Sequence, residues 1–373
     1  MIITPLSDLV EFYNGKTPNK DKDGQFALYG SNGRIGWSKS FNHENAIILG
    51  RVGAYCGSVE ICQNKFWASD NTIVVKVKEN NDLRYIYYRL FSYPLRSYAG
   101  GAAQPLLTQT ILRGIKINVE KDFHTQQKIA SVLSAYDDMI ENNLRRIALL
   151  EKSARLLYKE WFVKLHFPGH EHTPIVDGVP EGWEVKTVPQ IISINPKEKI
   201  DKGKEVWTVP MSCLSESSTM ISFDLMERKT KHNGAKFKNG DVLFPRITPC
   251  LENGKTALVQ FLDNGEIACG STEYIVLRGD KVSPEFTYCL ARTYNFRENA
   301  IKSMIGSSGR QRVQISCFSE YSVLIPPQPL LKQFDQFATP NFLQIKILQL
   351  QNQKLKQARD LLLPRLMNGE IPA

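Results

Sequence analysis

The chain has 373 residues, of which 42% are apolar, so it is long enough and apolar enough to bury cores in two or three domains. No apolar run approaches the ~20 residues of a membrane-spanning helix, and the mixed sequence that follows Met1 predicts no signal peptide. The seven cysteines form no CxxC pair, which favours reduced thiols in a cytoplasmic protein and no metal site. The net charge of +9 is compatible with a nucleic-acid partner.

Residues 1–122 are predicted to form a mixed, β-rich domain. The runs Ala46–Leu49 and Asn71–Val77 are typical of strands, and glycines separate the short segments of this region. Asp82–Phe91 is predicted to be a helix that Pro94 closes, and its aromatic side chains are expected to pack in the core.

The stretch Gln126–Leu165 contains neither proline nor glycine, and its apolar residues follow a seven-residue repeat. This pattern is typical of one strand of a coiled coil. A helix of 40 residues would be ~60 Å long, and it could not bury its apolar stripe without a partner. The seam residues are Leu133, Tyr136, Ile140, Asn143, Ile147, Leu150, Ala154, Leu157 and Trp161.

Residues 168–329 are predicted to form a second globular domain after a loop rich in proline and glycine. Its 19 basic and 19 acidic residues (counted over 168–330) make it neutral, so a DNA-binding face would need its basic residues to be concentrated locally. The segments predicted as regular structure are the strands Asp241–Phe244, Thr256–Phe261 and Tyr274–Leu277, and the helix Pro284–Tyr294.

A second long helix is predicted over Phe334–Leu366, again with a heptad seam. A shift of 205 positions superposes the two seams, for example Ile140 on Ile345. Three pairs of landmarks upstream of the helices also correspond: Ile48–Val52 with Leu243–Ile247, Ala68–Val74 with Gly270–Val276, and Gly100–Gln104 with Gly306–Gln311. The chain is therefore predicted to be a duplicated unit of one globular domain and one long helix.

The predicted fold class is α+β, with two mixed, β-rich domains separated by two long helices that form an antiparallel coiled coil with an internal pseudo-twofold repeat. An antiparallel pairing centred on Arg145 and Leu350 places residue i beside residue 495 − i, so Asn143 and Asn352 fall in one layer. We expect their amides to hydrogen-bond and to set the register of the seam. The predicted segments are 1–122, 123–167, 168–329 and 330–373.

No motif in the sequence indicates an active site. Two segments, Gly15-Lys16-Thr17 and Gly254-Lys255-Thr256, resemble the end of a phosphate-binding loop, but Val10 and Pro249 occupy the positions where that loop needs a glycine. Methyltransferase, nuclease and hydrolase motifs are also missing, so we expect no catalytic residues. Two alternatives stay open, a self-sufficient DNA-modifying enzyme and a coiled-coil scaffold without a nucleic-acid role.

The whole chain resembles the specificity subunit of type I restriction–modification enzymes. The resemblance is carried by the order of domains and helices and by four motifs. These motifs are Gln126-Gln127-Lys128-Ile129-Ala130, Pro180-Glu181-Gly182-Trp183-Glu184, Gly240-Asp241-Val242-Leu243-Phe244-Pro245-Arg246 and the closing segment from Leu361 to Ile371. The distal helix departs from the pattern, because it begins Leu330-Leu331-Lys332-Gln333-Phe334 in place of the Gln-Gln-Lys-Ile-Ala form.

The resemblance implies a non-catalytic, cytoplasmic subunit with two target recognition domains, each of which recognises one half of a split DNA sequence. The helices would bind methyltransferase subunits, two in number, and through them restriction and motor subunits. S-adenosylmethionine, ATP and Mg would be bound by those partners, and no cofactor by this chain. The helices would fix the spacing of the half-sites, and because the two domains differ in sequence, the double-stranded target should be asymmetric.

Candidate DNA contacts are basic and amide side chains in glycine-rich turns, because Lys and Arg suit phosphates, Arg suits guanine edges, and Asn or Gln suit adenine. Because Arg51 and Arg246 occupy equivalent positions in the repeat, a structural role in both copies is an alternative for them. The candidates are Lys16, Lys20, Ser31, Asn32, Arg34, Arg51 and Gln104 in the first domain, and Arg246, Lys255, Arg310, Gln311 and Arg312 in the second.

Overall fold

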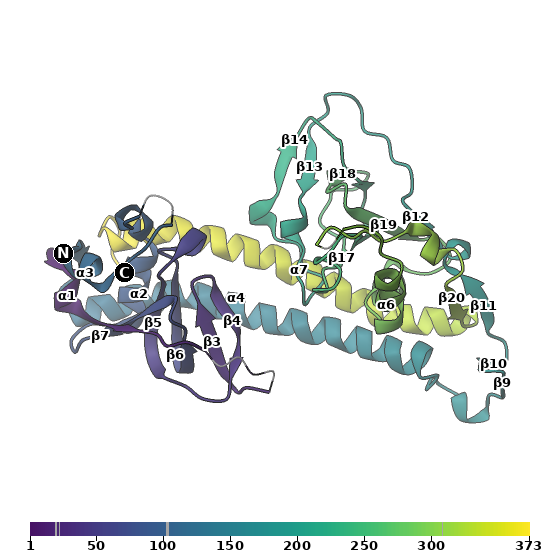
Figure 1. Cartoon of the computed structure of the whole chain (residues 1–373), viewed down its shortest axis with the longest axis horizontal. Coiled ribbons are helices and arrows are strands. Elements are labelled where there is room, and N and C mark those ends of the chain that lie inside the picture. The colour runs from purple at the N-terminus through teal and green to yellow at the C-terminus, as the bar shows by residue number, and fades with distance from the viewer. Residues whose placement is uncertain (19–20, 22, 102–103, 308) are drawn as a thin grey trace. The chain divides into compact units, whose positions relative to one another are not determined.

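The computed structural model describes residues 1–18, 21, 23–101, 104–307 and 309–373, and its elements are a mixture of helices and strands (Figure 1). The chain divides into two compact units. Unit 1 consists of Met1–Ile140 with Lys354–Ala373, and unit 2 consists of Glu141–Gln353. Each long helix therefore contributes one part to each unit. In the described part of the chain, no helix combines the length and apolarity needed to cross a membrane.

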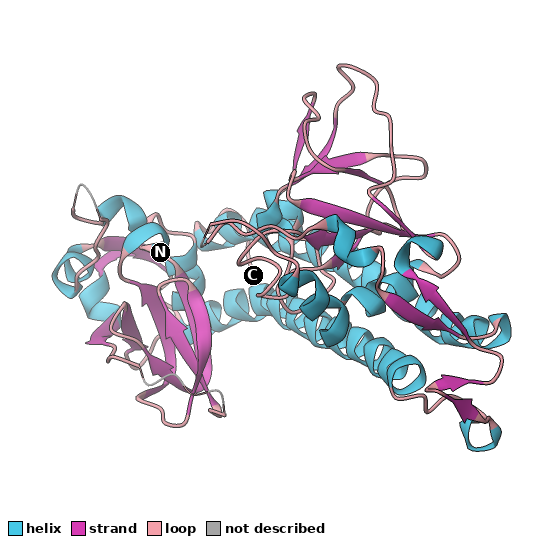
Figure 2. Ribbon diagram, turned by 45° about the vertical axis from the view of Figure 1, so that its right-hand side comes forward, coloured by secondary structure: helices cyan, strands magenta, loops and turns pink. Residues whose placement is uncertain are grey.

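Unit 1 is built on a six-stranded sheet with the strand order β2-β7-β5-β6-β3-β4, drawn in magenta in Figure 2. Neighbouring strands are antiparallel except β3 and β6, which are parallel. The strands are β2 (Val10–Asn14), β3 (Phe26–Gly30), β4 (Gly33–Ser38), β5 (His43–Gly50), β6 (Val59–Ala68) and β7 (Thr72–Val77). The two predicted strands of this domain are confirmed as parts of β5 and β7.

Short helices and a two-stranded pair cover the core of unit 1. Strands β1 (Ile2–Pro5) and β8 (Lys116–Val119) pair in antiparallel fashion. Helix α2 (Leu83–Phe91) confirms the predicted helix; it begins where the Asp82 carboxylate accepts a hydrogen bond from the Tyr85 N–H at 2.8 Å. The remaining helices are α1 (Leu6–Leu9), α3 (Gln109–Gly114) and the 3₁₀ turns η1 (Gly53–Tyr55) and η2 (Leu95–Tyr98).

Unit 2 contains two four-stranded sheets, with the orders β12-β19-β16-β17 and β14-β13-β18-β15. The first consists of β12 (Ile192–Ile194), β19 (Tyr274–Gly279), β16 (Val242–Pro245) and β17 (Ala257–Leu258). The second consists of β14 (Glu227–Lys229), β13 (Val206–Val209), β18 (Ala268–Gly270) and β15 (Lys236–Phe237). Two further pairs are β11 (Glu184–Thr187) with β20 (Ser322–Ile325), and β9 (Ile175–Val176) with β10 (Val179–Pro180).

The predicted helix Pro284–Tyr294 is wrong in extent, because the structure has two helices in its place. Helix α5 (Pro284–Ala291) ends at the Arg292–Thr293 junction, and α6 (Tyr294–Lys302) follows. The Thr293 hydroxyl accepts a hydrogen bond from the Phe296 N–H and so caps the start of α6. The 3₁₀ turns in the described residues of unit 2 are η4 (His170–His172), η5 (Val188–Gln190), η6 (Met211–Cys213), η7 (Phe223–Leu225) and η8 (Ile315–Phe318).

The central helix α4 spans Phe123–Tyr158 and continues as a π-helical turn, η3 (Lys159–Val163), so the predicted end at Leu165 is wrong. In this turn the Lys164 N–H donates to the Lys159 carbonyl at 2.9 Å. Tyr158 and Phe162, on either side of the change, both pack edge-on against Phe334 of the second long helix. Aromatic packing therefore accompanies the change in helical geometry.

The distal helix α7 spans Gln328–Met367 and runs antiparallel to α4 in each unit. In unit 2, the Asn143 amide donates to Asn352 Oδ1 at 2.9 Å, and the Asn341 amide donates to the Ser153 hydroxyl at 3.2 Å. In unit 1, Arg359 pairs with Asp137. The residue numbers of these pairs add up to 495, 494 and 496, so the predicted pairing of i with 495 − i is confirmed, as is the Asn143–Asn352 hydrogen bond.

The two units contain matching pairs of elements. β1 pairs with β8 in unit 1, and β11 pairs with β20 in unit 2. β7 pairs with both β2 and β5, and β19 pairs with both β12 and β16. Helix α2 follows β7 and helix α5 follows β19, so the order of elements in the chain matches as well.

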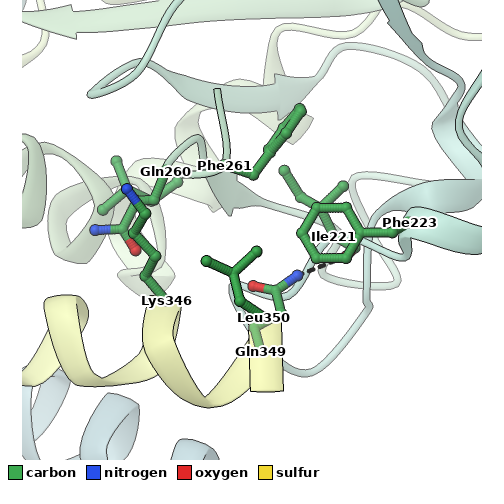
Figure 3. Close-up of a pocket in the computed structure, with 8 residues that line it drawn as sticks. Ile221, Phe223, Gln260, Phe261, Lys346, Gln349 and Leu350 are labelled. Atoms are coloured by element: carbon green, nitrogen blue, oxygen red, sulfur yellow. Dashed lines mark hydrogen bonds between the residues drawn. The ribbon is translucent and has the colours of Figure 1, made fainter. Parts of the chain in front are cut away.

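In unit 2, α7 also packs on the globular part. Figure 3 shows Gln349 pointing toward Ile221, and its amide donates to the Ile221 carbonyl at 2.6 Å. Phe223, Phe261 and Leu350 surround this contact, and the space that they enclose is about 10 Å³. Such a cavity holds at most one water, so this contact is packing between the helix and the domain.

Candidate nucleic-acid interface

In unit 1, four loops meet where β5 ends. The Arg51 N–H donates to the Asn71 carbonyl at 2.9 Å, and the Arg51 carbonyl accepts from the Leu107 N–H at 2.9 Å. Gly50 lies so close to its neighbours that a Cβ there would be 2.4 Å from the Tyr55 carbonyl oxygen and 2.6 Å from the Ser31 carbonyl oxygen. Glycine at this position therefore allows the loops to converge.

Two predicted contact residues of unit 1 have partners within the protein. The Ser31 hydroxyl donates to the Asn71 carbonyl at 2.7 Å and accepts from the Val52 N–H at 3.4 Å, so it stabilises the turn. The guanidinium of Arg34 lies over the Trp37 ring, 5.1 Å from its centroid.

Three other candidates of unit 1, Lys16, Asn32 and Gln104, are exposed, and Lys20 lies outside the described residues. Asn32 is in the same turn as Ser31, whereas Gln104 is in the loop that Gly100 and Leu106 close through reciprocal backbone hydrogen bonds of 3.0 and 2.9 Å. The structure therefore brings Ser31, Arg51 and the Gln104 loop to one junction.

Unit 2 has a junction of the same construction. The Arg246 N–H donates to the Glu273 carbonyl at 2.9 Å, and the Arg246 carbonyl accepts from the Val313 N–H at 2.8 Å. Ile305 and Arg312 close a loop through reciprocal backbone hydrogen bonds of 3.0 Å each. The structure thus brings together Arg246 and the segment from Arg310 to Arg312, as far as the described residues of the loop show.

A salt bridge lies at the junction of unit 2. The Arg312 Nε donates to both carboxylate oxygens of Glu273 at 3.0 Å, and its Nη2 donates to Glu273 Oε1 at 2.7 Å. These hydrogen bonds hold the pKa of Glu273 below its ordinary value, and the positive charge of Arg246 lowers that pKa further. Glu273 is thus ionised at neutral pH and holds Arg312 on one edge of its guanidinium.

The other candidates of unit 2 differ in their surroundings. The Gln311 N–H donates to the Thr248 hydroxyl at 3.2 Å, while Arg310 is exposed. The Lys255 amine donates to the Met211 carbonyl at 3.1 Å and is half-buried, so its position is fixed from within the domain. Of these three, Arg310 has the side chain most open to solvent.

The equivalent positions of the two junctions carry different chemistry. The backbone carbonyl of Asn71 accepts the Arg51 N–H, and that of Glu273 accepts the Arg246 N–H. Leu106 and Arg312 occupy the equivalent positions at which the loops close. Glu273 was not among the predicted site residues. The correspondence of Ala68–Val74 with Gly270–Val276 placed it opposite Asn71, so the exchange of an amide for a carboxylate was the signal that could have identified it.

The long helix α4 fixes the globular part of unit 2 through a buried carboxylate. Glu151 accepts hydrogen bonds from the Tyr288 hydroxyl at 2.6 Å and from the Thr219 N–H at 2.8 Å, and it is 2% exposed. In unit 1, Asp137 of α4 accepts from the Tyr88 hydroxyl of α2 at 2.6 Å. Each domain is therefore bonded to the helix by a tyrosine–carboxylate pair.

A groove of about 990 Å³ lies in unit 2 between α4 and the segment that contains α5 and α6. Its lining includes the exposed apolar residues Leu156, Val163 and Tyr294, and the basic residues Lys152 and Lys159. Exposed apolar side chains with a polar rim are typical of a surface for a protein partner.

Comparisons with known proteins identify a family for this architecture. Residues 3–152 match the family model described as the type I restriction modification DNA specificity domain. The chain is 26% identical to the type I restriction enzyme MjaIX specificity subunit of Methanocaldococcus jannaschii, over 99% of this chain and 90% of that protein. It is 32% identical to the EcoAI specificity subunit of Escherichia coli, over 51% of this chain and 33% of that protein.

A solved structure has the same fold. The S subunit of a type I restriction–modification system from M. genitalium superposes with a TM-score of 0.59 at 16% sequence identity. The match covers 98% of this chain and 96% of that one.

Proposed function

Because this chain belongs to the type I restriction–modification specificity subunits, we propose that it recognises a bipartite, asymmetric sequence in double-stranded DNA for a methyltransferase complex. The observation that carries this proposal is the presence of two junctions with the same backbone hydrogen bonds and different side chains. Equivalent scaffolds with different side chains are suited to recognise two different half-sites.

The proposal includes an internal duplication with a pseudo-twofold antiparallel coiled coil, which we infer from the matched element pairs and from the pairing of i with 495 − i. In this view α4 and α7 separate two target recognition domains, and their length sets the number of base pairs between the half-sites. The Asn143–Asn352 hydrogen bond then sets the register of the helices.

We further propose two equivalent docking surfaces for methyltransferase subunits on the helices. Leu156 and Leu361 lie 205 positions apart and are 47% and 72% exposed. Val132 and Phe337 are also 205 positions apart and are 39% and 43% exposed. These two pairs give each unit at least one exposed apolar side chain from each helix, which supports one partner per unit.

In this proposal the chain carries out recognition, and catalysis belongs to its partners. S-adenosylmethionine, ATP and Mg²⁺ are assigned to the methyltransferase and restriction subunits, with this chain as the part that selects the DNA. The assignment is supported by the sequence, which has no methyltransferase or nuclease motif.

The test is to map methylated adenines in cells that express the methyltransferase subunit with and without this chain. We expect one split, asymmetric motif that depends on the chain. Purified complex should bind a duplex with this motif more tightly than one with either half-site scrambled, and its affinity should fall as the salt concentration rises.

Two results would contradict the proposal. A scaffold without a nucleic-acid role predicts the same methylation pattern with and without the chain. Methylation or cleavage of DNA by the purified chain alone would instead show that it is a self-sufficient enzyme.

A further inference from the structure

We propose that Arg312 recognises one guanine in the half-site of the second domain, and that Glu273 is the residue that positions it. This inference rests on the proposed function and adds to it a named base, a contacting residue and a positioning residue. Three features of the junction in unit 2 support it.

The first feature is the geometry of the ion pair. A guanidinium has two edges that can form paired hydrogen bonds, the Nε/Nη2 edge and the Nη1/Nη2 edge. Glu273 occupies the Nε/Nη2 edge, because Arg312 donates to it from Nε at 3.0 Å and from Nη2 at 2.7 Å. Among the described residues, the Arg312 guanidinium hydrogen-bonds only to Glu273, so its Nη1/Nη2 edge is open there. A paired contact from such an edge to O6 and N7 of guanine is the commonest base-specific contact of arginine.

The second feature is the combination of rigidity and exposure. The Arg312 side chain is 46% exposed, whereas the Glu273 side chain that holds it is 22% exposed. The backbone of Glu273 is fixed at both ends, because its carbonyl accepts the Arg246 N–H at 2.9 Å and its N–H donates to the Ser271 hydroxyl at 3.1 Å. An arginine whose orientation is fixed before binding loses less side-chain entropy when it contacts a base.

The third feature is that the loop does not need this ion pair in order to close. In unit 1 the equivalent loop is closed by the same two backbone hydrogen bonds, with Leu106 in place of Arg312 and Asn71 in place of Glu273. Because the loop forms without a charged pair there, the pair in unit 2 is available for recognition. Its presence in one unit only is consistent with different bases in the two half-sites.

The experiment uses the complete complex with its methyltransferase subunits and compares three forms of this chain: the natural sequence, Arg312→Lys and Glu273→Gln. Lysine keeps the positive charge but cannot form the paired contact to guanine. We expect Arg312→Lys to make one G·C position of the methylated motif degenerate, with about tenfold to a hundredfold less discrimination at that position. Glu273→Gln should weaken discrimination at the same position by a smaller factor. The other half-site should be unchanged in both variants.

The matched control is the ion pair between Arg228 and Glu266, which has similar exposure (40% and 16%) and lies in the same unit. Arg228→Lys should leave discrimination at the G·C position assigned to Arg312 unchanged. An unchanged motif in Arg312→Lys would overturn the proposal. So would uniform loss of methylation in both variants with assembled complex, because this indicates a structural role for the loop. If the natural chain gave no motif at all, the proposed function itself would fail, and this assignment would fall with it.

Discussion

The Asn143–Asn352 contact places two amides among apolar residues of the seam. Asn143 is 5% exposed, and its neighbour in the seam, Ile147, is 1% exposed. The Nδ2 of Asn352 is buried and has no hydrogen-bond partner among the described residues. The pair therefore lowers the stability of the seam, but its hydrogen bond forms only in one register and so specifies how the helices align.

Replacing one of these asparagines should cost more than replacing both. Asn143→Leu leaves the Asn352 amide without its partner, so we expect the free energy of unfolding to fall by about 1–3 kcal/mol. The double variant Asn143→Leu, Asn352→Leu removes both polar groups and should be close to the natural protein or more stable. Urea unfolding followed by circular dichroism measures this, and additive losses in the double variant would contradict it.

Glu273 makes the stability of unit 2 depend on pH in the acid range. Its hydrogen bonds with Arg312 lower its pKa in the folded state. The stabilisation is therefore fully present above the unfolded-state pKa of about 4.3 and is lost as the pH falls through the lower folded-state pKa. Because Arg312 is 46% exposed, solvent screens the pair and the effect is small.

Glu273→Gln should remove this part of the pH dependence. We expect the melting temperature of the variant to fall less than that of the natural protein between about pH 5 and pH 3. Thermal unfolding at a series of pH values compares the two, with Glu266→Gln as a control for the loss of another paired carboxylate in this unit. If the melting temperatures of Glu273→Gln and the natural chain fell in parallel with pH, the contribution of Glu273 to the pH dependence would be disproved.

Among the elements, α4 has one buried stripe in unit 2 that meets two different neighbours. The stripe consists of Asn143, Ile147, Glu151, Ala154 and Tyr158, which follow one another at spacings of three or four residues. The Tyr158 ring packs edge-on against Phe286 of α5, with centroids 4.9 Å apart. The helix therefore serves both as one side of the seam and as the support on which the domain is built.

Glu151→Ala should destabilise unit 2 strongly. The change leaves the Tyr288 hydroxyl and the Thr219 N–H buried without an acceptor, so we expect a loss of about 2–5 kcal/mol in the free energy of unfolding. The matched control is Glu141→Ala on the same helix, where the carboxylate is 62% exposed and pairs with Arg145. This control should change stability by less than about 0.5 kcal/mol in chemical denaturation, and similar losses for both variants would argue against Glu151 as an anchor.

At the scale of the whole molecule, the chain presents corresponding elements twice. The exposed residues Leu156 and Leu361 occupy equivalent positions on α4 and α7, one in each unit. If each belongs to a separate docking surface, then changes at the two residues should affect two partners independently.

Leu156→Asp and Leu361→Asp should each remove one methyltransferase subunit, and the double variant should remove both, because a charge in an apolar contact must be desolvated without a partner. Native mass spectrometry of the assembled complex measures the stoichiometry. Asn142→Asp, at an exposed side chain of α4, controls for the same charge change of −1. Loss of both subunits from either single variant would show that the two surfaces are not independent.

Features that depend on local pattern could be predicted from the sequence. The heptad spacing identified both long helices, and an antiparallel pairing centred on Arg145 and Leu350 predicted the register in which Asn143 meets Asn352. Alternating and β-branched segments located β5 and β7. These properties could be predicted because helical period and strand character arise from residues that are close together in the chain.

Which candidate side chains are already bound within the protein depends on contacts between distant segments. Ser31 donates to a carbonyl 40 residues away, Lys255 to one 44 residues away, and Arg312 to a carboxylate 39 residues away. The π turn after Tyr158 likewise accompanies aromatic contacts with α5 and α7. Such contacts form only when distant segments meet, and no local pattern encodes which donor will find which acceptor.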